Sequence, residues 1–326
     1  MKRRIFLTAS AVWLLAGRPV PASAQSRRGP VVIGWLAMGS REAGASSLAA
    51  FKQGLAELGW KEGAQVVVEA RWAEGKQERL SALLKEVLAM KPAVIVVGPR
   101  AVTVAAKEAP NTPLVQAAGG DLVTGGFAKT YARPGGMVTG ITGLPVDASE
   151  KYIELLASAV PKLRRIGFLI DPNVLAPDIH RKTARQAAKR LSLQPLLAEA
   201  ATAEAIEPAL ASLAKQGAEA LVPMPSPFFG YEQPRILRFA QAQRWPMAGG
   251  SGWAERGALL SYFADASENH RRSAHYVDRI LKGTKPGDLP LEQPRKFELV
   301  INAKTARALG ISVPQSVLLQ ASRVIE

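Results

Sequence analysis

The segment VVIGWLAMGS, residues 31–40, has the pattern of a buried β-strand that ends in a turn. Apolar and β-branched residues run without interruption up to Met38, and small residues follow, as in the strands of parallel sheets. The segment RIGFLIDPN, residues 165–173, repeats this pattern. IGWL at 33–36 matches IGFL at 166–169 with an offset of 133 residues. The sequence therefore predicts one structural unit that occurs twice.

Strands and helices are expected to alternate around each of these two segments. In the first half we expect strands at 31–37, 65–71, 93–97 and 113–116, with helices at about 44–58, 76–90 and 101–109. In the second half we expect strands at 165–170, 194–198, 218–223, 246–248 and 258–262, with helices at about 148–159, 178–191, 202–215 and 232–243. This alternation is typical of parallel sheets covered by helices. The predicted fold class is α/β, with two doubly wound, Rossmann-like lobes.

The first 24 residues have the features of an export signal. Three basic residues, Lys2 to Arg4, precede 13 uncharged residues, and the segment ends in Ala-Ser-Ala at 22–24. An apolar run of that length is too short to cross a bilayer, and the small residues form a cleavage site. Arg3-Arg4 followed by Ile-Phe-Leu is compatible with the twin-arginine route, and the general secretory route remains equally open. We expect a periplasmic protein.

The charge of the chain first suggests a nucleic-acid partner, because 42 Lys and Arg residues face 27 Asp and Glu residues. Removing residues 1–24 takes away four basic residues and lowers the net charge from +15 to +11. The remaining excess lies in short clusters separated by apolar residues, which is typical of solvated helix faces. We therefore expect no nucleic-acid binding. The absence of cysteine excludes thiolate catalysis and suits an oxidising compartment.

A solute site is expected between the lobes, because ligands of doubly wound folds bind at the carboxyl ends of the strands. The loops at those ends supply the candidate contacts. In the first lobe these are Gly39, Ser40, Arg100, Ala101 and Asp121. In the second lobe these are Asp171, Asn173, Ser226, Phe228, Phe229, Trp253 and Tyr262.

Several of these residue types fit a small polar or aromatic solute. The guanidinium of Arg100 suits a carboxylate, and the carboxylate of Asp121 suits an ammonium group. Phe228, Phe229 and Trp253 are expected to stack on a planar ring.

Each candidate also has a purely structural alternative. Arg100 could be a surface arginine at the start of a helix, and Ser40 could cap a helix. The Asp-Pro-Asn sequence at 171–173 is also typical of an ordinary turn. We interpret Trp35 and Trp72 as packing residues of the core or hinge.

Motifs for catalysis and cofactors are absent from the sequence. It contains no G-x-G-x-x-G after either first strand, no phosphate-binding P-loop, no H-E-x-x-H and no G-x-S-x-G. The histidines His180, His270 and His275 do not form a pattern of metal ligands. We expect no cofactor, no metal site, no catalytic residue and no enzymatic activity.

Longer phrases of the chain resemble one family. EARWAEGKQERL (69–80), ILKGTKPGDLPLEQPRKFELVIN (280–302) and TARALGISVPQSVLLQASRVIE (305–326) resemble the ABC-transporter substrate-binding proteins that include tryptophan- and tyrosine-type solute receptors. The resemblance covers nearly the whole chain. It implies a type I periplasmic-binding-protein fold with a multi-strand hinge. It also implies capture of a small solute and its delivery to an inner-membrane permease.

The chain departs from the family pattern at Arg100, where a small or hydroxyl-bearing residue is usual, at Leu122, where proline is common after Gly-Asp, and at Met38 in the first loop. The departure at Arg100 favours a solute with an anionic group. We expect an amino-acid-like, aromatic or carboxylate-bearing solute and a monomeric receptor. A ligand-sensing module of a membrane sensor and a two-lobed envelope enzyme remain alternatives.

The expected domain boundaries follow the repeat. Residues 30–143 and about 264–300 form the N-terminal lobe, 144–263 form the C-terminal lobe, and 301–326 form a tail that crosses at the hinge. Hinge crossings are expected near 140–146 and 262–266, and within 290–326.

Overall fold

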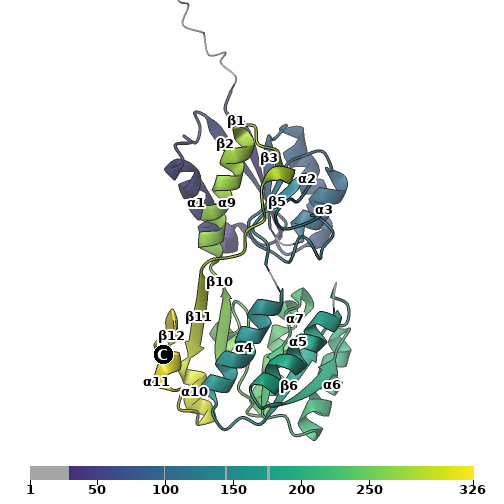
Figure 1. Cartoon of the computed structure of the whole chain (residues 1–326), viewed down its shortest axis with the longest axis vertical. Coiled ribbons are helices and arrows are strands. Elements are labelled where there is room, and N and C mark those ends of the chain that lie inside the picture. The colour runs from purple at the N-terminus through teal and green to yellow at the C-terminus, as the bar shows by residue number, and fades with distance from the viewer. Residues whose placement is uncertain (1–28, 99, 144, 175–176) are drawn as a thin grey trace, which may run out of the picture.

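The computed structural model describes residues 29–98, 100–143, 145–174 and 177–326. They form two α/β lobes, one above the other in Figure 1, with their sheets joined by connecting segments. The predicted signal peptide, residues 1–24, lies outside the described residues. Within the described part of the chain, no helix combines the length and apolar character that a bilayer crossing requires.

The N-terminal lobe contains a five-stranded parallel sheet in the order β2-β1-β3-β4-β5. Its strands are β1 (Val31–Ala37), β2 (Val66–Trp72), β3 (Val94–Val97), β4 (Leu114–Gln116) and β5 (Val138–Gly140). Its helices are α1 (Arg41–Glu57), η1 (Gln77–Arg79), α2 (Leu80–Ala89), α3 (Ala101–Glu108) and α9 (Ala266–Leu281), with η3 (Pro286–Asp288) after α9.

Helices bury both faces of this sheet, which explains why its central strand β3 is apolar at every position. All four residues of β3 are buried. One core, around Leu84 and Val97, joins α2 and α3 to the sheet. The other, around Phe51 and Val277, joins α1 and α9 to the opposite face. The carboxyl ends of the strands point toward the second lobe (Figure 1).

The C-terminal lobe repeats this plan. Its strands are β6 (Arg165–Ile170), β7 (Gln194–Glu199), β8 (Ala220–Pro223), β9 (Ala248–Gly249) and β10 (Leu260–Ala264). β7, β6 and β8 are parallel neighbours, a bridge from Leu221 to Met247 leads on toward β9, and β9 pairs in parallel with β10. These strands belong to two sheets, one of β7, β6 and β8 and one that contains β10 and β9, and the bridge between them gives the succession β7-β6-β8-β9-β10, which matches the strand order of the first lobe. The predicted α/β fold class is confirmed.

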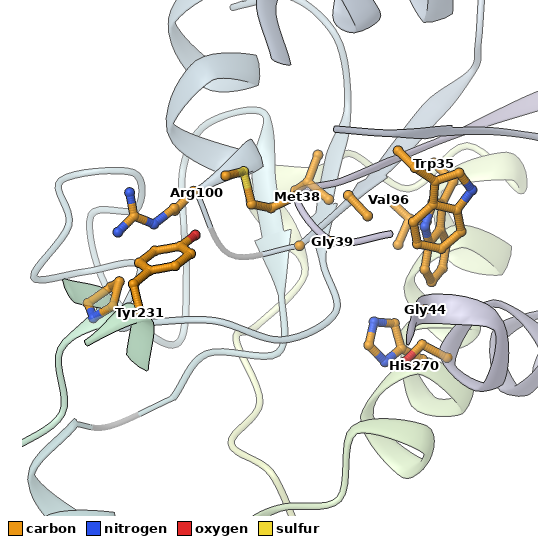
Figure 2. Close-up of a pocket in the computed structure, with 14 residues that line it drawn as sticks. Trp35, Met38, Gly39, Gly44, Val96, Arg100, Tyr231 and His270 are labelled. Atoms are coloured by element: carbon orange, nitrogen blue, oxygen red, sulfur yellow. The ribbon is translucent and has the colours of Figure 1, made fainter. Parts of the chain in front are cut away.

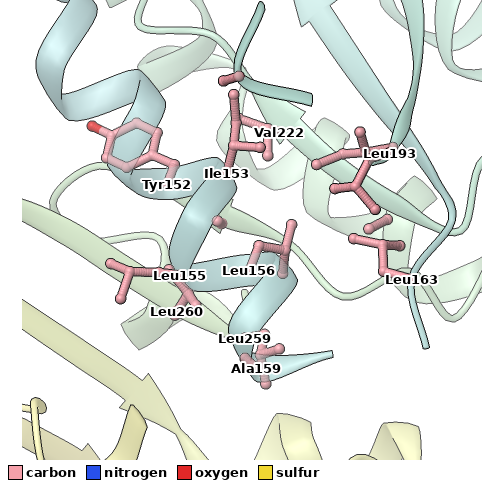
Figure 3. Close-up of a cluster of buried hydrophobic side chains, with 14 of the residues drawn as sticks. Tyr152, Ile153, Leu155, Leu156, Ala159, Leu163, Leu193, Val222, Leu259 and Leu260 are labelled. Carbon is pink, nitrogen blue, oxygen red and sulfur yellow. The ribbon is translucent and has the colours of Figure 1, made fainter. Parts of the chain in front are cut away.

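The helices of this lobe again cover both faces. They are α4 (Pro145–Ala159), α5 (Pro177–Arg190), α6 (Ala203–Lys215), α7 (Pro227–Tyr231) and α8 (Gln233–Ala242), with η2 (Ala254–Arg256) before β10. Figure 3 shows α4 placing Ile153 and Leu156 against Val222 and Leu260 of the sheet.

The C-terminal segment of the chain differs from the sequence prediction. Strand β11 (Phe297–Asn302) pairs antiparallel with β10, and β12 (Arg323–Ile325) pairs in parallel with β11. Helices α10 (Ala303–Leu309) and α11 (Gln315–Leu318) bury Ala306 and Val317 in the C-terminal core. The structure therefore places 297–326 in the C-terminal lobe, neither in the N-terminal lobe nor in a tail across the hinge. Of the described residues after β10, those of α9 and η3 and the following Leu289 and Leu291 pack in the first lobe.

The connections between the lobes lie between β5 and α4, between β10 and α9, and between η3 and β11 (Figure 1). The last two are held together where the Asp265 N–H donates to the Lys296 carbonyl at 2.9 Å. Glu292 ties them to the N-terminal lobe, since its carboxylate accepts two hydrogen bonds from Arg272 at 3.0 and 2.7 Å. These contacts hold the second and third connections next to each other and attach them to the N-terminal lobe.

Candidate functional site

A cavity of about 280 Å³ opens at the carboxyl ends of β1 and β3, on the side that faces the second lobe (Figure 2). The N-terminal lobe supplies most of its wall, and α7 of the C-terminal lobe closes one side. The lining residues are Trp35, Ala37, Met38, Gly39, Gly44, Ser47, Trp72, Val96, Val97, Gly98, Arg100, Pro227, Tyr231 and His270.

Two indole rings form the inner wall. Trp35 on β1 and Trp72 at the end of β2 lie with their ring centroids 6.1 Å apart, tilted by 50°. Trp35 is only 3% exposed. The ring of Trp72 lies directly over Gly44 of α1, where a Cβ atom would stand 2.1 Å from it. Glycine at position 44 therefore lets Trp72 lie flat against α1 and leaves the cavity open.

Arg100 lies at the mouth of the cavity. It precedes α3 with a positive φ of 64°, a backbone conformation that disfavours residues with a side chain. Its Nη1 donates to Gln77 Oε1 at 2.7 Å, and its guanidinium carbon lies 5.7 Å from the ring centroid of Tyr231 in the opposite lobe. Figure 2 shows the two side chains next to each other, away from Trp35 and His270. Arg100 thus brings a positive charge to the boundary between the lobes.

His270 of α9 reaches the cavity from the side opposite Val96 (Figure 2). Its ring packs on Trp35, with centroids 5.3 Å apart, and its Nδ1 lies 2.5 Å from the Ala266 carbonyl. Burial lowers the pKa of His270, more than the hydrogen bond to Ala266 raises it. The imidazole is therefore neutral at pH 7.

The C-terminal lobe carries a buried carboxyl group, Asp171, that is not among the residues lining the cavity. Asp171, at the end of β6, is 4% exposed. It accepts hydrogen bonds from the Asn173 N–H at 2.9 Å and from Ser226 Oγ at 2.6 Å. Ser226 caps α7, the helix that carries Tyr231, and its Oγ accepts from the Phe228 N–H at 3.1 Å. Among the described residues, Asn173 and Ser226 donate to Asp171, and no Lys or Arg forms an ion pair with it.

His180 of α5 lies near this carboxylate and is itself buried. Burial lowers the pKa of His180, and the negative charge of Asp171 opposes that shift. The end of β6 therefore brings a buried carboxyl group close to a buried imidazole.

The structure brings together only part of the predicted site. Gly39 and Arg100 line the cavity. Asp171, Asn173 and Ser226 form one hydrogen-bonded group at the edge of the second lobe.

Four other candidates are packing residues. Ala101 is buried in the core of the N-terminal lobe. Phe229 and Trp253 are buried in the C-terminal lobe, and Phe228 packs against Phe229 with ring centroids 5.4 Å apart. These aromatic rings do not line the cavity in this structure, because α7 turns the phenylalanines toward the C-terminal core and Trp253 covers Gly249.

The remaining candidates have local partners. Ser40 Oγ accepts from the Ala43 N–H at 3.2 Å and caps α1. Asp121 accepts from Tyr131 Oη at 2.6 Å, and hydrogen bonds from its own turn hold its pKa low against burial. Tyr262 stacks on Phe297, with centroids 5.2 Å apart. None of the three lines the cavity.

The sequence does not point to Tyr231 or His270 as cavity residues. The interpretation of Trp35 and Trp72 as packing residues agrees with the structure, which buries both in the core of the N-terminal lobe, and each ring also lines the cavity. The strand pattern does contain a signal for Trp35. Side chains alternate along a strand, so Trp35 lies on the same face of β1 as Ala37, which lines the cavity at the end of the strand. No local signal could place His270, because α9 returns to the first lobe from far along the chain.

Comparisons with known proteins agree with this architecture. The family described as ABC transporter substrate binding protein matches residues 37–325. A curated relative, the Tyrosine-binding protein of Clostridioides difficile (strain R20291), is 22% identical over 264 residues, which is 80% of this chain and 75% of the relative.

Solved structures show the same fold. An ABC domain from Streptococcus pneumoniae in complex with L-Trp aligns with a TM-score of 0.77 at 24% identity, over 91% of this chain and all of that one. A conserved domain protein from Vibrio cholerae aligns with a TM-score of 0.76 at 22% identity, over 90% of this chain and 99% of that one. The predicted two-lobed fold is thus confirmed, and the chain belongs to the ABC transporter substrate-binding proteins, a family of solute receptors with the type I periplasmic-binding-protein fold.

Proposed function

We propose that this protein captures an aromatic amino acid in the cleft between its lobes and delivers it to an inner-membrane ABC permease without changing it chemically. The observation that carries the proposal is the cavity walled by Trp35 and Trp72, with the guanidinium of Arg100 at its mouth. Such a cavity matches a ring joined to a carboxylate. The names of two relatives, one binding tyrosine and one solved with L-Trp, support the same solute class.

The size of the cavity sets the size of the solute. At about 280 Å³ it lies at the lower end of the range for small-molecule sites, so it holds a ring and little more. The wall is mainly apolar, with Met38, Val96 and Val97 beside the two indoles. Burying a planar ring there is favourable, and offset aromatic contacts add to that gain.

The charged ends of an amino acid fit the two edges of the cleft. Arg100 matches a carboxylate, because its planar fork donates two parallel hydrogen bonds. Asp171 of the other lobe lies outside the cavity in this structure, and it matches an ammonium group once the hinge closes, because no Lys or Arg of the described residues pairs with it. A solute that contacts both residues draws the lobes together by hinge closure.

Export to the periplasm and a monomeric state complete the proposal. The sequence features of residues 1–24 support export, and the family itself consists of proteins that act outside the cytoplasm. The permease is expected to recognise the closed, loaded form.

A ligand screen tests the proposal. Purified protein, residues 25–326, is tested by thermal shift against amino acids, aromatic acids, purines and sugars. Because a ligand of the native state raises Tm, tyrosine, tryptophan or phenylalanine is expected to raise Tm, and sugars are not. Small-angle scattering should show a smaller radius of gyration with the active ligand.

Calorimetry then separates binding from catalysis. The expected result is one site per chain and unchanged solute after long incubation. Turnover of a solute, or a shift produced only by purines or sugars, contradicts the proposal.

A further inference from the structure

We propose that His270 selects solutes whose aromatic ring carries an N–H or O–H donor, by accepting that hydrogen bond at Nε2. This inference rests on the proposed function, because it names which aromatic solutes the cavity prefers. It makes His270 a specificity-determining residue at the inner end of the cavity.

The position of His270 supports the first step. The side chain is 8% exposed, lines the cavity and packs on Trp35. Figure 2 shows its imidazole pointing from α9 toward the space below Gly39 and Val96. Arg100 and Tyr231 lie at the other end of the cavity in the same view. A solute anchored by its carboxylate at Arg100 therefore directs its ring toward His270.

The contacts of the ring determine which nitrogen faces the solute. A carbonyl oxygen only accepts hydrogen bonds, so the contact of Nδ1 with the Ala266 carbonyl places the proton on Nδ1. Burial keeps the imidazole neutral. Nε2 then carries a lone pair and acts as an acceptor.

Nε2 has no donor within the protein. No hydrogen bond to it is found from the residues that the structure describes. The neighbouring wall consists of the apolar side chains of β3 and the indole of Trp35, whose Nε1–H is buried and forms no hydrogen bond with Nε2 or with any other described group. A ring with an O–H or N–H satisfies this acceptor. A plain phenyl ring excludes water from Nε2 but offers no hydrogen-bond donor. Nε2 is then a buried acceptor without a partner, which is unfavourable.

Matched ligand pairs test the idea on the unmodified protein. Calorimetry compares tyrosine with phenylalanine, and tryptophan with 3-benzothienylalanine, in which sulfur replaces the ring N–H at almost the same shape. We expect the donor-bearing member of at least one pair to bind about tenfold more tightly or better. Equal affinities within both pairs overturn the inference.

Variants at position 270 connect this preference to the imidazole. His270→Phe keeps a ring on Trp35 but has no acceptor, so the preference should fall to about onefold. His270→Gln places an amide near the position of Nε2 and should retain part of the preference. His275→Gln, a histidine on the same helix that does not line the cavity, serves as the matched control and should leave both pairs unchanged. An undiminished preference in a folded His270→Phe protein also overturns the inference.

Nitrogen NMR gives a readout that does not depend on substitutions. In protein labelled with ¹⁵N-histidine, the Nε2 resonance of His270 should shift when tryptophan binds and stay nearly unchanged with benzothienylalanine. The same shift with both ligands argues against a hydrogen bond at Nε2. If none of these amino acids binds the wild-type protein, the proposed function itself fails, and this outcome is distinct from binding without discrimination.

Discussion

Arg100 combines a strained backbone with a functional side chain. A φ of 64° on a residue with a Cβ atom costs about 1–3 kcal/mol, and the site holds arginine nevertheless. The guanidinium is held at the cleft mouth by Gln77 and faces Tyr231 across the lobe boundary. We interpret the strain as a consequence of placing a positive charge where the solute carboxylate binds.

Replacing Arg100 with glycine should separate stability from binding. Arg100→Gly removes the backbone strain and should raise the free energy of unfolding by about 1 kcal/mol relative to Arg100→Ala. Both variants should bind the carboxylate-bearing solute at least tenfold more weakly, because a buried carboxylate loses its charged donor. Urea unfolding measures the first quantity and calorimetry the second.

Lys91 provides the control for this pair of variants. It also has a positive φ, of 53°, but is exposed and lies outside the cavity. Lys91→Gly should gain stability and bind the solute normally. Wild-type affinity in Arg100→Ala removes Arg100 from the site.

Gly44 keeps the cavity open. A methyl group at this position meets Trp72 at 2.1 Å, so Gly44→Ala forces the indole away from α1. The cavity lies on that side, and we expect the affinity for an aromatic solute to fall about tenfold or more, while the helix itself gains propensity. Calorimetry on Gly44→Ala and on Ser46→Ala, an exposed change in the same helix, checks this. Equal affinities in the two variants contradict it.

The sequence could identify candidate site residues only where their place after a buried strand was sufficient to locate them. Arg100 and Asp171 follow buried strands directly, and parallel strands bring such positions to one edge. The choice among aromatic residues could not be made in the same way. Trp35, Phe229 and Trp253 are all buried aromatic residues, and only the packing of α7 and η2 keeps Phe229 and Trp253 away from the cavity.

At the scale of elements, α9 links the hinge to the solute cavity. It starts at Asp265, whose carboxylate pairs with Lys296 at 2.8 Å, continues through His270, and packs along α1. The two helices approach closely at Gly54, where a Cβ atom would lie 2.4 Å from the Arg271 carbonyl oxygen. The position of His270 therefore depends on the contact between α1 and α9.

A methyl group at position 54 should separate these helices. Gly54→Ala clashes with backbone, which cannot rotate away as a side chain can, and we expect a loss of about 1–3 kcal/mol in the free energy of unfolding. Solute affinity should fall as well, since α9 moves with His270. Gly230→Ala in α7, where a Cβ atom meets nothing within 4 Å, is the control for urea unfolding. A stability of Gly54→Ala equal to that of the control contradicts the prediction.

The strands that the sequence predicts in the repeat lie within about two residues of the observed ones, because buried parallel strands are short apolar runs between helices. Strand β5 (Val138–Gly140) is not among the predicted strands, because its three residues, Val-Thr-Gly, do not form such an apolar run. The C-terminal elements were not assigned to the correct lobe. The sequence FELVIN at 297–302 predicts an apolar strand but does not indicate its partner. The strand belongs to the C-terminal lobe because of its long-range pairing with β10. Local pattern identifies a strand but not the sheet that it joins.

At the scale of the whole molecule, the two lobes respond to acid in the same direction. Each contains a buried histidine, His180 in one and His270 in the other, and burial lowers the pKa of both. The unfolded chain therefore binds more protons than the folded protein below about pH 6.5, and stability falls as the pH decreases. Carboxylates with lowered pKa, such as Glu292 and Asp278, add to this loss only below about pH 4.5.

The two pH ranges allow the histidines to be tested alone. Between pH 7 and 5 the ligand-free protein should lose stability by up to about 1.4 kcal/mol per pH unit for each histidine, because each proton is bound only on unfolding. His180→Leu removes one of these groups and should reduce the slope by about half. His275 is half-exposed, so solvent screens its contribution, and His275→Gln should change the slope little. Urea unfolding at half-unit pH steps measures the slope. An unchanged slope in His180→Leu means that His180 is protonated as readily in the folded protein as in the unfolded chain.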